Sequence, residues 1–253
     1  MSGPAASAPL SVVIPAYNEE TRLPATLTRI AAHLKTLEVE AEIVVVDDGS
    51  TDRTAAVVQG LAGAIPGLRL DRHPENRGKG AAVRSGVLQA AGGYILISDA
   101  DLSTPIEELD RFLPLLQAGA DLVIGSRAHP ASRILLHQPW HREMMGKLFN
   151  LFVRVLVLRG LKDTQCGFKA LRAPTVRPLF ARQRITGFGF DVEILYLARK
   201  AGLAIQEVPV TWINSPSSRV HLLKHPLGML LDLFRIRLND LRGCYRGLGA
   251  DTR

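Results

Sequence analysis

Residues 43–50 read IVVVDDGS, and residues 95–101 read ILISDAD. In both stretches a short apolar run ends in a pair of acidic residues. Nearly continuous apolar runs of this length are typical of strands covered on both faces of a sheet. Ligands of open α/β sheets bind beyond the carboxyl ends of such strands. The two stretches therefore predict the fold class and also the place of the chemistry.

The chain around them alternates between apolar runs and helical patterns. Apolar residues recur at steps of four and three over residues 23–37, which predicts a helix with Pro24 near its start. Pro105 opens a second predicted helix, with Thr104 as its N-cap. This alternation predicts an α/β fold with a mostly parallel, Rossmann-like sheet flanked by helices. The expected strands are Leu10–Ile14, Ile43–Val46, Leu68–Leu70, Tyr94–Ile97 and Leu122–Ile124.

The composition excludes several classes of protein. With 47% hydrophobic and 22% charged residues over 253 positions, the chain has ample material for one large core and is too apolar for disorder. Two cysteines without metal-ligand spacing argue against a disulfide framework or a zinc site. Prolines interrupt residues 1–18, which predicts that no signal peptide is present, and no apolar run reaches the roughly 20 residues of a membrane span. We expect a cytoplasmic protein.

The second half of the chain is richer in basic amphipathic segments. Residues 134–159 and 219–246 both set leucine and phenylalanine among arginine and lysine, and the whole chain carries a net charge of +7. Such segments can lie on an anionic membrane, pack on the sheet or form an oligomer interface. We expect one domain over residues 1–220 and an amphipathic C-terminal appendage over residues 221–253, peripherally associated with the inner face of a membrane.

The paired acids suit a metal ion. Residues i and i+2 of an extended segment point the same way, so Asp99 and Asp101 present two carboxylates to one side. Hard oxygen ligands of this kind suit Mg²⁺ or Mn²⁺, which take further oxygens from substrate phosphates. Any single Asp is also common as a turn or capping residue. Two acidic pairs at two strand ends favour the metal interpretation.

Other phosphate-binding motifs are absent from the sequence. Gly78-Lys79-Gly80 lacks a P-loop pattern, and Val83 stands where a dinucleotide fingerprint has its third glycine. The residues after the first strand, Pro15 to Glu19, form no glycine-rich turn. Kinase-like use of ATP and binding of NAD therefore lose support.

Several ordered segments carry a family resemblance. Together they resemble the inverting family 2 glycosyltransferases of the GT-A fold, and in particular the dolichyl- and polyprenyl-phosphate sugar synthases that transfer β-glucose or mannose. The segments are VVIPAYNE at 12–19, VDDGSTD at 46–52, NRGKG at 76–80, DAD at 99–101, GSR at 125–127, DTQCGFK at 163–169, FDVE at 190–193 and EVPVTW at 207–212.

The resemblance implies a role for each matching residue. Asp99 and Asp101 would hold the metal on the donor diphosphate, and Arg127 and Arg142 would engage the acceptor phosphate. The mannosyl relatives often carry Gln two positions after the second metal Asp, where this chain has Ser103. This difference leaves the third metal ligand open and weakens the mannose alternative. The other implied sets are Pro15, Tyr17, Glu19, Asp47, Asp48 and Lys79 around the nucleotide, Gln165, Asp191 and Glu193 along the sugar and acceptor cavity, and Ser217, Ser218 and Arg219 as a loop that closes over the donor.

The expected reaction is transfer of a hexose, glucose from UDP-glucose in the first place, to a polyprenyl phosphate at the membrane surface. A phosphate monoester has its second pKa near 6, so it is largely a dianion at neutral pH and needs no general base. It needs cations to position it, and guanidinium groups clamp phosphates in fixed geometry. The alternatives are transfer of mannose from GDP-mannose, and a non-catalytic basic module for lipid or nucleic acid. The paired acids argue against such a module, so we expect no nucleic-acid partner.

Overall fold

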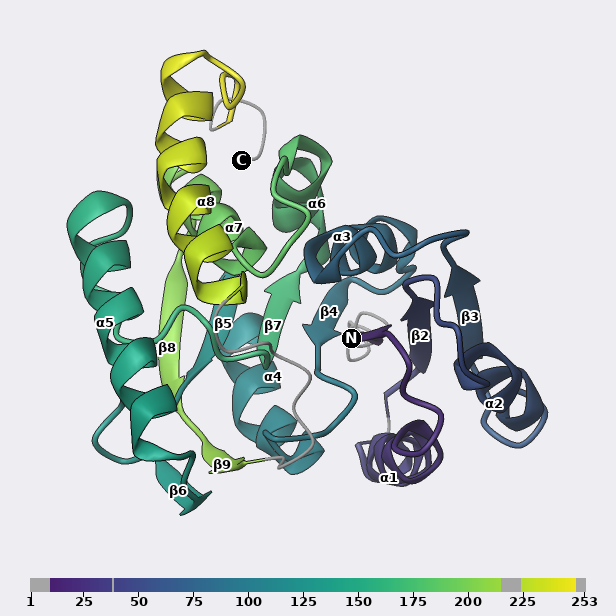
Figure 1. The fold of residues 1–253 in the computed structure, drawn as a ribbon. Coiled ribbons are helices and arrows are strands. Elements are labelled where there is room, and N and C mark those ends of the chain that lie inside the picture. The colour runs from purple at the N-terminus through teal and green to yellow at the C-terminus, as the bar shows by residue number, and fades with distance from the viewer. Residues whose placement is uncertain (1–9, 38, 215–223, 249–253) are drawn as a thin grey trace, which may run out of the picture.

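The computed structural model describes residues 10–37, 39–214 and 224–248, without the side chains of residues 141–142 and 224–226. Its centre is a seven-stranded mixed sheet, and a second sheet of two strands lies beside it (Figure 1). The strands are β1 (Leu10–Ala16), β2 (Ala41–Asp47), β3 (Leu68–Arg72), β4 (Tyr94–Ile97), β5 (Leu122–Ser126), β6 (Arg133–Leu136), β7 (Lys169–Arg172), β8 (Ile205–Pro209) and β9 (Thr211–Ile213).

The large sheet has the strand order β3-β2-β1-β4-β7-β5-β8. Strands β3, β2, β1 and β4 run parallel to one another, and β5 is parallel to β8. All five predicted strands are present, each at the predicted place and most of them one to three residues longer. The fold class, a mostly parallel sheet flanked by helices, is therefore confirmed.

The sheet departs from the parallel pattern at β7. This short strand lies between β4 and β5 and runs antiparallel to both, so that Lys169 is the register partner of Ile97 on one side and of Ile124 on the other. Because β7 runs backwards, its first residue lies at the edge of the sheet where β4 and β5 end. The apolar runs and helical patterns of the sequence do not predict this strand.

Helices cover both faces of the sheet (Figure 1). Alternation along β1 separates the two layers, since Val13 belongs to one core cluster while Val12 and Ile14 belong to the other. The helices are α1 (Leu23–Thr36), α2 (Thr54–Leu61), α3 (Lys79–Gln89), α4 (Leu109–Gln117), α5 (Trp140–Leu156), α6 (Ala173–Arg182), α7 (Phe190–Lys200) and α8 (Lys224–Leu241), with a 3₁₀ turn, η1 (Ile106–Glu108), before α4.

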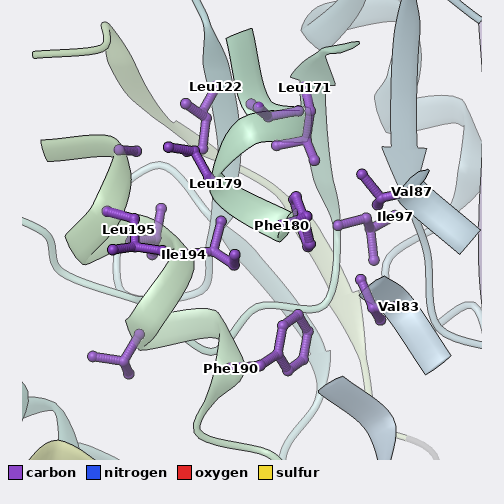
Figure 2. Packing of buried hydrophobic residues seen from close by; sticks show 14 of the residues in the cluster. Val83, Val87, Ile97, Leu122, Leu171, Leu179, Phe180, Phe190, Ile194 and Leu195 are labelled. Atoms are coloured by element: carbon purple, nitrogen blue, oxygen red, sulfur yellow. The ribbon is translucent and has the colours of Figure 1, made fainter. Parts of the chain in front are cut away.

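The core cluster on the α3, α6 and α7 face is continuous across the sheet. Figure 2 shows Val83 of α3 and Phe180 of α6 lying against Ile97 of β4. Helix α8 joins the same cluster through Leu233 and Ile236, both completely buried. The C-terminal helix is thus part of the main core. The domain boundary at residue 220 stays a prediction, because it falls among residues outside the described ranges.

The predicted N-cap at Thr104 is wrong. Helix α4 follows η1, whose N-cap position is Pro105 and carries no side-chain cap. The Thr104 hydroxyl instead lies 3.7 Å from the Cys166 sulfur, in the interior. A buried tertiary contact has taken the hydroxyl that the local sequence pattern assigned to the helix end.

Within the described part of the chain, no helix combines the length and the apolar character needed to span a bilayer.

Candidate active site

The candidate site lies at the edge of the large sheet where β1, β2, β4 and β5 end. Asp99 follows β4, and its Oδ1 atom lies 2.6 Å from the Nζ atom of Lys79, the first residue of α3. Burial opposes ionisation of the Asp99 carboxyl, but the Lys79 ammonium outweighs burial and holds the pKa of Asp99 below its ordinary value. The pKa of Lys79 is raised in turn, because the nearby carboxylates outweigh its burial. Both groups are therefore charged at neutral pH.

Gly167 makes room for the Asp99 carboxylate. A Cβ atom at this position would lie 2.0 Å from Asp99 Oδ2 and 2.6 Å from its Cγ. Any side chain here would push the carboxylate away from its present place. The glycine of the DTQCGFK segment thus has a steric reason that the sequence alone does not show.

A second carboxylate–lysine pair lies beside the first. The Nζ atom of Lys169, at the start of β7, lies 2.6 Å from Oδ1 of Asp191 and also donates to the carbonyl of Cys166. Burial raises the pKa of Asp191, and this effect outweighs the attraction of Lys169 and Lys79. Lys169 also helps to lower the pKa of Asp99. We call Lys79, Asp99, Lys169 and Asp191 the charged cluster.

Sequence reasoning missed Lys169. It ends the segment DTQCGFK, but the helix and strand patterns do not distinguish a charged residue at the head of the short run KAL from a surface lysine. The antiparallel direction of β7 carries it into the site, and topology of this kind is not visible in local sequence.

Asp101 lies two residues beyond Asp99 and turns the chain. Its Oδ1 atom accepts the backbone N–H of Ser103 at 2.9 Å, and Leu102 between them has a positive φ of 46°. Among the described residues no group of three or more His, Cys, Asp and Glu side chains could hold a metal ion. Two carboxylates are therefore what this chain offers at the end of β4.

Arg127 follows β5 and is held by a buried carboxylate. Its Nε and Nη2 atoms lie 2.7 and 2.9 Å from the two oxygens of Asp163, which also accepts the Arg127 backbone N–H. Burial of Asp163 favours its neutral form, but the Arg127 guanidinium prevails and lowers the pKa of Asp163 to about 2. Among the described residues Nη1 of Arg127 has no hydrogen-bond partner, so one edge of the guanidinium is left for a ligand.

Two further residues hold this pair in place. Glu207 of β8 accepts the backbone N–H groups of Lys162 and Asp163, which fixes the segment that carries the Asp163 carboxylate. The ring of Trp212 lies under the guanidinium, with its centroid 5.7 Å from the Arg127 Cζ atom. The guanidinium is thus fixed in orientation.

Gln165 is placed next to this pair. Its backbone N–H donates to Asp163 Oδ1 at 3.0 Å. Its side-chain Nε2 atom is buried and has no hydrogen-bond partner within the described structure. Unsatisfied buried donors are costly, and one in a candidate site is consistent with a ligand contact.

The loops after β1 and β2 form the other end of the site. The Asn18 backbone N–H donates to Ser50 Oγ at 2.8 Å, and the Asn18 side chain accepts the Thr51 N–H. Pro15 lies within β1, Tyr17 is exposed just beyond it, and Glu19 forms an ion pair with Arg22. The segment that carries Tyr17, Asn18 and Glu19 is thus held against the loop after β2.

Asp47 and Asp48 are buried beneath these loops. The Asp47 carboxylate accepts the Ser50 N–H at 2.9 Å, and Arg72 Nε lies 3.1 Å from its second oxygen without hydrogen-bond alignment. Asp48 accepts the backbone N–H groups of Arg77 and Gly78. Direct contact with base and ribose stays a prediction for both residues.

Asp48 also organises the approach of Lys79. It lies 2.7 Å from His73 Nδ1, and with the two loop amides this contact fixes the turn that leads into α3. Gly78 in this turn has a φ of 99°, a conformation that glycine adopts without strain. The sequence could not show that residues 77–78 fold back onto Asp48.

Glu193 lies behind the site. It is completely buried, and its carboxylate accepts the N–H groups of Arg184 and Ile185 and the Tyr245 hydroxyl. These contacts assign it the support of the loop before α7, whereas lining of the sugar cavity stays an untested prediction. Arg142 belongs to α5, but its side chain is outside the described part, as are Ser217, Ser218 and Arg219.

A family model for glycosyl transferase family 2 matches residues 11–174. This range includes Lys79, Asp99 and Lys169 of the charged cluster. The chain belongs to glycosyl transferase family 2. It is 37% identical over 249 residues to the dolichyl-phosphate β-glucosyltransferase of Dictyostelium discoideum, a match that covers 94% of this chain and 76% of the relative. The enzymes of the same description from Drosophila melanogaster and Homo sapiens are 38% and 34% identical, and each match covers 94% of this chain and 77% of the relative. The protein is therefore a glycosyltransferase.

Solved structures confirm the GT-A fold of this transferase. Mannosyl-3-phosphoglycerate synthase from Rubrobacter xylanophilus matches with a TM-score of 0.68 and 20% identity over 97% of this chain and 78% of that one. Glucosyl-3-phosphoglycerate synthase from Mycobacterium tuberculosis, in complex with Mn²⁺ and UDP-glucose, matches with a TM-score of 0.66 and 19% identity over 96% of this chain and 81% of that one.

Proposed function

We propose that this transferase moves glucose from UDP-glucose to dolichyl phosphate or another polyprenyl phosphate, with inversion at the anomeric carbon. The observation that supports this most directly is the meeting, at one sheet edge, of Asp99 and Lys79 with an arginine that Asp163 holds in place. Lys79, and Asp99 through a bound metal ion, suit a donor diphosphate. Arg127 suits an acceptor phosphate. The names of the relatives that match nearly the whole chain supply the sugar and the lipid.

The proposed site uses a divalent ion, Mg²⁺ or Mn²⁺. Asp99 and Asp101 would hold it, and the donor set fits because hard carboxylate oxygens with water and diphosphate oxygens suit either ion. The Mn²⁺ complex of a structural neighbour supports this part of the proposal. When bound, the ion stabilises the negative charge that develops on the departing diphosphate. The two carboxylates do not fill the coordination sphere of either ion, and a third protein ligand is not assigned.

The chain's own residues position the two reactants. Lys79 is charged and can turn from Asp99 to the donor diphosphate, where an ammonium adds electrostatic stabilisation. Asp99 stays ionised because of its lowered pKa. The ion pair of Lys169 and Asp191 holds the other half of the charged cluster in place.

Arg127 would orient the acceptor phosphate through its remaining N–H edge. A dianionic phosphate oxygen attacks the anomeric carbon, and the bond from that carbon to the diphosphate oxygen breaks with its electron pair leaving on UDP. No proton moves in this step, so no general base is required. Gln165, with its unsatisfied amide, and Arg142 are further proposed contacts of sugar or acceptor.

We place the enzyme at the cytoplasmic face of a membrane, because a long polyprenyl phosphate is insoluble in water. Its proposed partners are the nucleotide sugar, the lipid phosphate and the membrane surface. The proposed loop of Ser217, Ser218 and Arg219 would close over the donor.

The test is incubation of the purified protein with vesicles that contain polyprenyl phosphate, Mg²⁺ or Mn²⁺ and radiolabelled UDP-glucose. Organic extraction and mass analysis should find a polyprenyl-phosphate hexose. A variant with Asp99→Asn and Asp101→Asn should lose this product, and full activity in that variant would refute the metal site. Label in lipid with GDP-mannose but none with UDP-glucose would replace the donor assignment.

A further inference from the structure

Both glycines of the GKG segment lie against a loop from a distant part of the chain. This loop, residues 186–189, reads TGFG and lies between α6 and α7. A Cβ atom at Gly78 would lie 2.5 Å from the Thr186 carbonyl oxygen. One at Gly80 would lie 2.9 Å from the carbonyl oxygen of Gly187. The two glycines thus make room for the backbone of the 186–189 loop.

Contacts at both ends hold the 186–189 loop in place. At one end the Ala81 N–H of α3 donates to the Thr186 carbonyl oxygen at 3.1 Å. At the other end a Cβ atom at Gly189 would lie 2.7 Å from Oδ2 of Asp232, a buried residue of α8. The loop is therefore fixed between α3 and α8.

The 186–189 loop brings an aromatic ring to Lys79. Phe188 is half-buried, and the Lys79 Nζ atom lies over its ring, 6.0 Å from the centroid. The same Nζ atom lies 2.6 Å from Asp99 Oδ1. An ammonium at this distance is attracted by the negative face of an aromatic ring. Ring and carboxylate therefore both act on the same ammonium.

The loop also connects the two halves of the charged cluster. It leads directly into α7, whose second residue is Asp191. The Asp191 carboxylate lies 2.6 Å from Lys169 Nζ and also contributes to the raised pKa of Lys79. A ring in this loop is thus placed relative to both ion pairs.

The proposed reaction requires Lys79 to change partners. In the structure its ammonium contacts Asp99, and in the proposed function it turns to the donor diphosphate. A lysine side chain is flexible, so an ammonium that leaves its carboxylate can take many directions. A ring face attracts the ammonium but carries no net charge. It can limit these directions without neutralising the positive charge that a diphosphate needs.

We propose that Phe188 is a positioning residue of the transfer reaction, whose ring keeps the Lys79 ammonium where the donor diphosphate binds. The 186–189 loop is then part of the donor site, and Gly78 and Gly80 serve to admit it. The role of Lys79 toward a diphosphate rests on the proposed function, whereas the contact of ring and ammonium rests on the placement of the loop.

The test measures the affinity of the full chain for UDP-glucose with Mn²⁺, by calorimetry and without acceptor. Phe188→Leu keeps an apolar side chain but loses the ring face, and should weaken binding by about threefold to tenfold. Its thermal midpoint should change little, because the ring is only half-buried. Phe188→Tyr should restore most of the affinity. Phe234→Leu, an exposed phenylalanine on α8, is the matched control and should bind as the wild type does.

Two further readouts distinguish attraction of a cation from simple packing. In the Lys79→Gln background, Phe188→Leu should cost little more, because the charge that the ring attracts is gone. Phenylalanines with increasing numbers of ring fluorines at position 188 should weaken binding step by step. Fluorine withdraws electron density from the ring face while the ring nearly keeps its shape, so packing alone predicts no such series.

Three results would overturn the assignment: equal affinity in Phe188→Leu and the wild type, an equal loss in the Lys79→Gln background, or a loss that does not grow with fluorine. The last two would leave Phe188 as a packing residue. Failure of the proposed function is read from the wild type instead. If UDP-glucose binds and no lipid product forms, the acceptor is refuted while the binding series still decides the role of Phe188. If GDP-mannose binds in place of UDP-glucose, the series is measured with that donor, since both carry a diphosphate.

Discussion

Even the smallest substitution of Gly167, to alanine, should disable the site. A Cβ atom there would meet Asp99 Oδ2 at 2.0 Å, so Gly167→Ala must displace the carboxylate. We expect kcat/KM to fall by about 100-fold, since displacement of a reacting group by about 1 Å costs that much. The thermal midpoint should change little. Gly60→Ala, where a Cβ atom has nothing within 4 Å, is the control. Unchanged activity in Gly167→Ala would show that Asp99 is not needed where it now lies.

Lys79 competes for the carboxylate that is proposed to hold the metal. Its ammonium lies 2.6 Å from Asp99. In Lys79→Gln, we expect Mn²⁺ binding without nucleotide to become tighter or stay the same, because the competing charge is gone. Binding of UDP-glucose should weaken by roughly tenfold or more, since a charge-assisted contact is lost. Electron paramagnetic resonance of free Mn²⁺ and calorimetry measure the two affinities.

The control for Lys79 is Lys35→Gln, an exposed lysine on α1. It removes one positive charge at a distance from the cluster. If Lys79→Gln weakens binding of Mn²⁺ alone, the two cations do not compete for Asp99, and Lys79 instead orders the site.

Asp163 links stability to pH. Its pKa is lowered from 3.8 to about 2 in the folded protein, so its ionised form stabilises the fold above the ordinary pKa and this contribution is lost as the pH falls toward 2. Asp163→Asn should lower the free energy of unfolding at pH 7 by about 3 kcal/mol, because Arg127 loses its buried partner. Urea unfolding over a range of pH measures the difference.

The difference between wild type and Asp163→Asn should shrink between about pH 4 and 2, since the wild-type carboxyl becomes protonated in that range. A difference that stays constant with pH would mean that the ion pair is not its source. Acceptor KM should also rise in Asp163→Asn, because Arg127 is then no longer fixed.

At the scale of elements, Tyr245 joins the end of the chain to α7. Its hydroxyl donates to Glu193, and Asn239 of α8 donates to the same hydroxyl. Tyr245→Phe should lower the free energy of unfolding by about 1–3 kcal/mol, the usual cost of an unsatisfied buried group, and leave kcat/KM unchanged. Tyr94→Phe, at the start of β4, is the control. A large loss of kcat without loss of stability would place Glu193 in the chemistry.

Local patterns predicted the strands whose residue types are dictated by burial on both faces of the sheet. Buried parallel strands such as β2 need apolar residues at every position, and this makes them visible in sequence. Strand β7 was missed because it is four residues long and begins and ends with a basic residue. Thr104 was assigned to a helix end because nothing local reveals that Cys166 lies against it.

The candidate site was predictable where it depends on strand ends. Asp99 lies where a strand leaves the sheet, and the sequence places it there. Lys169 was not predictable, because an antiparallel strand brings it in from residues far along the chain. The position of Asp48 near the site was predicted, but its hydrogen bonds to the backbone N–H groups of residues 77 and 78 were not.

At the scale of the whole molecule, the place of β7 has a consequence for synthesis. Strand β5 is made before β7, yet it can join the sheet only through β7. While the ribosome has not passed residue 172, the edge of β4 has no neighbour on that side, and an open edge of this kind invites pairing between chains. Nascent chains that stall in this interval should be especially prone to aggregate. The same strand that brings Lys169 to Asp99 thus makes completion of the sheet depend on the second half of the chain.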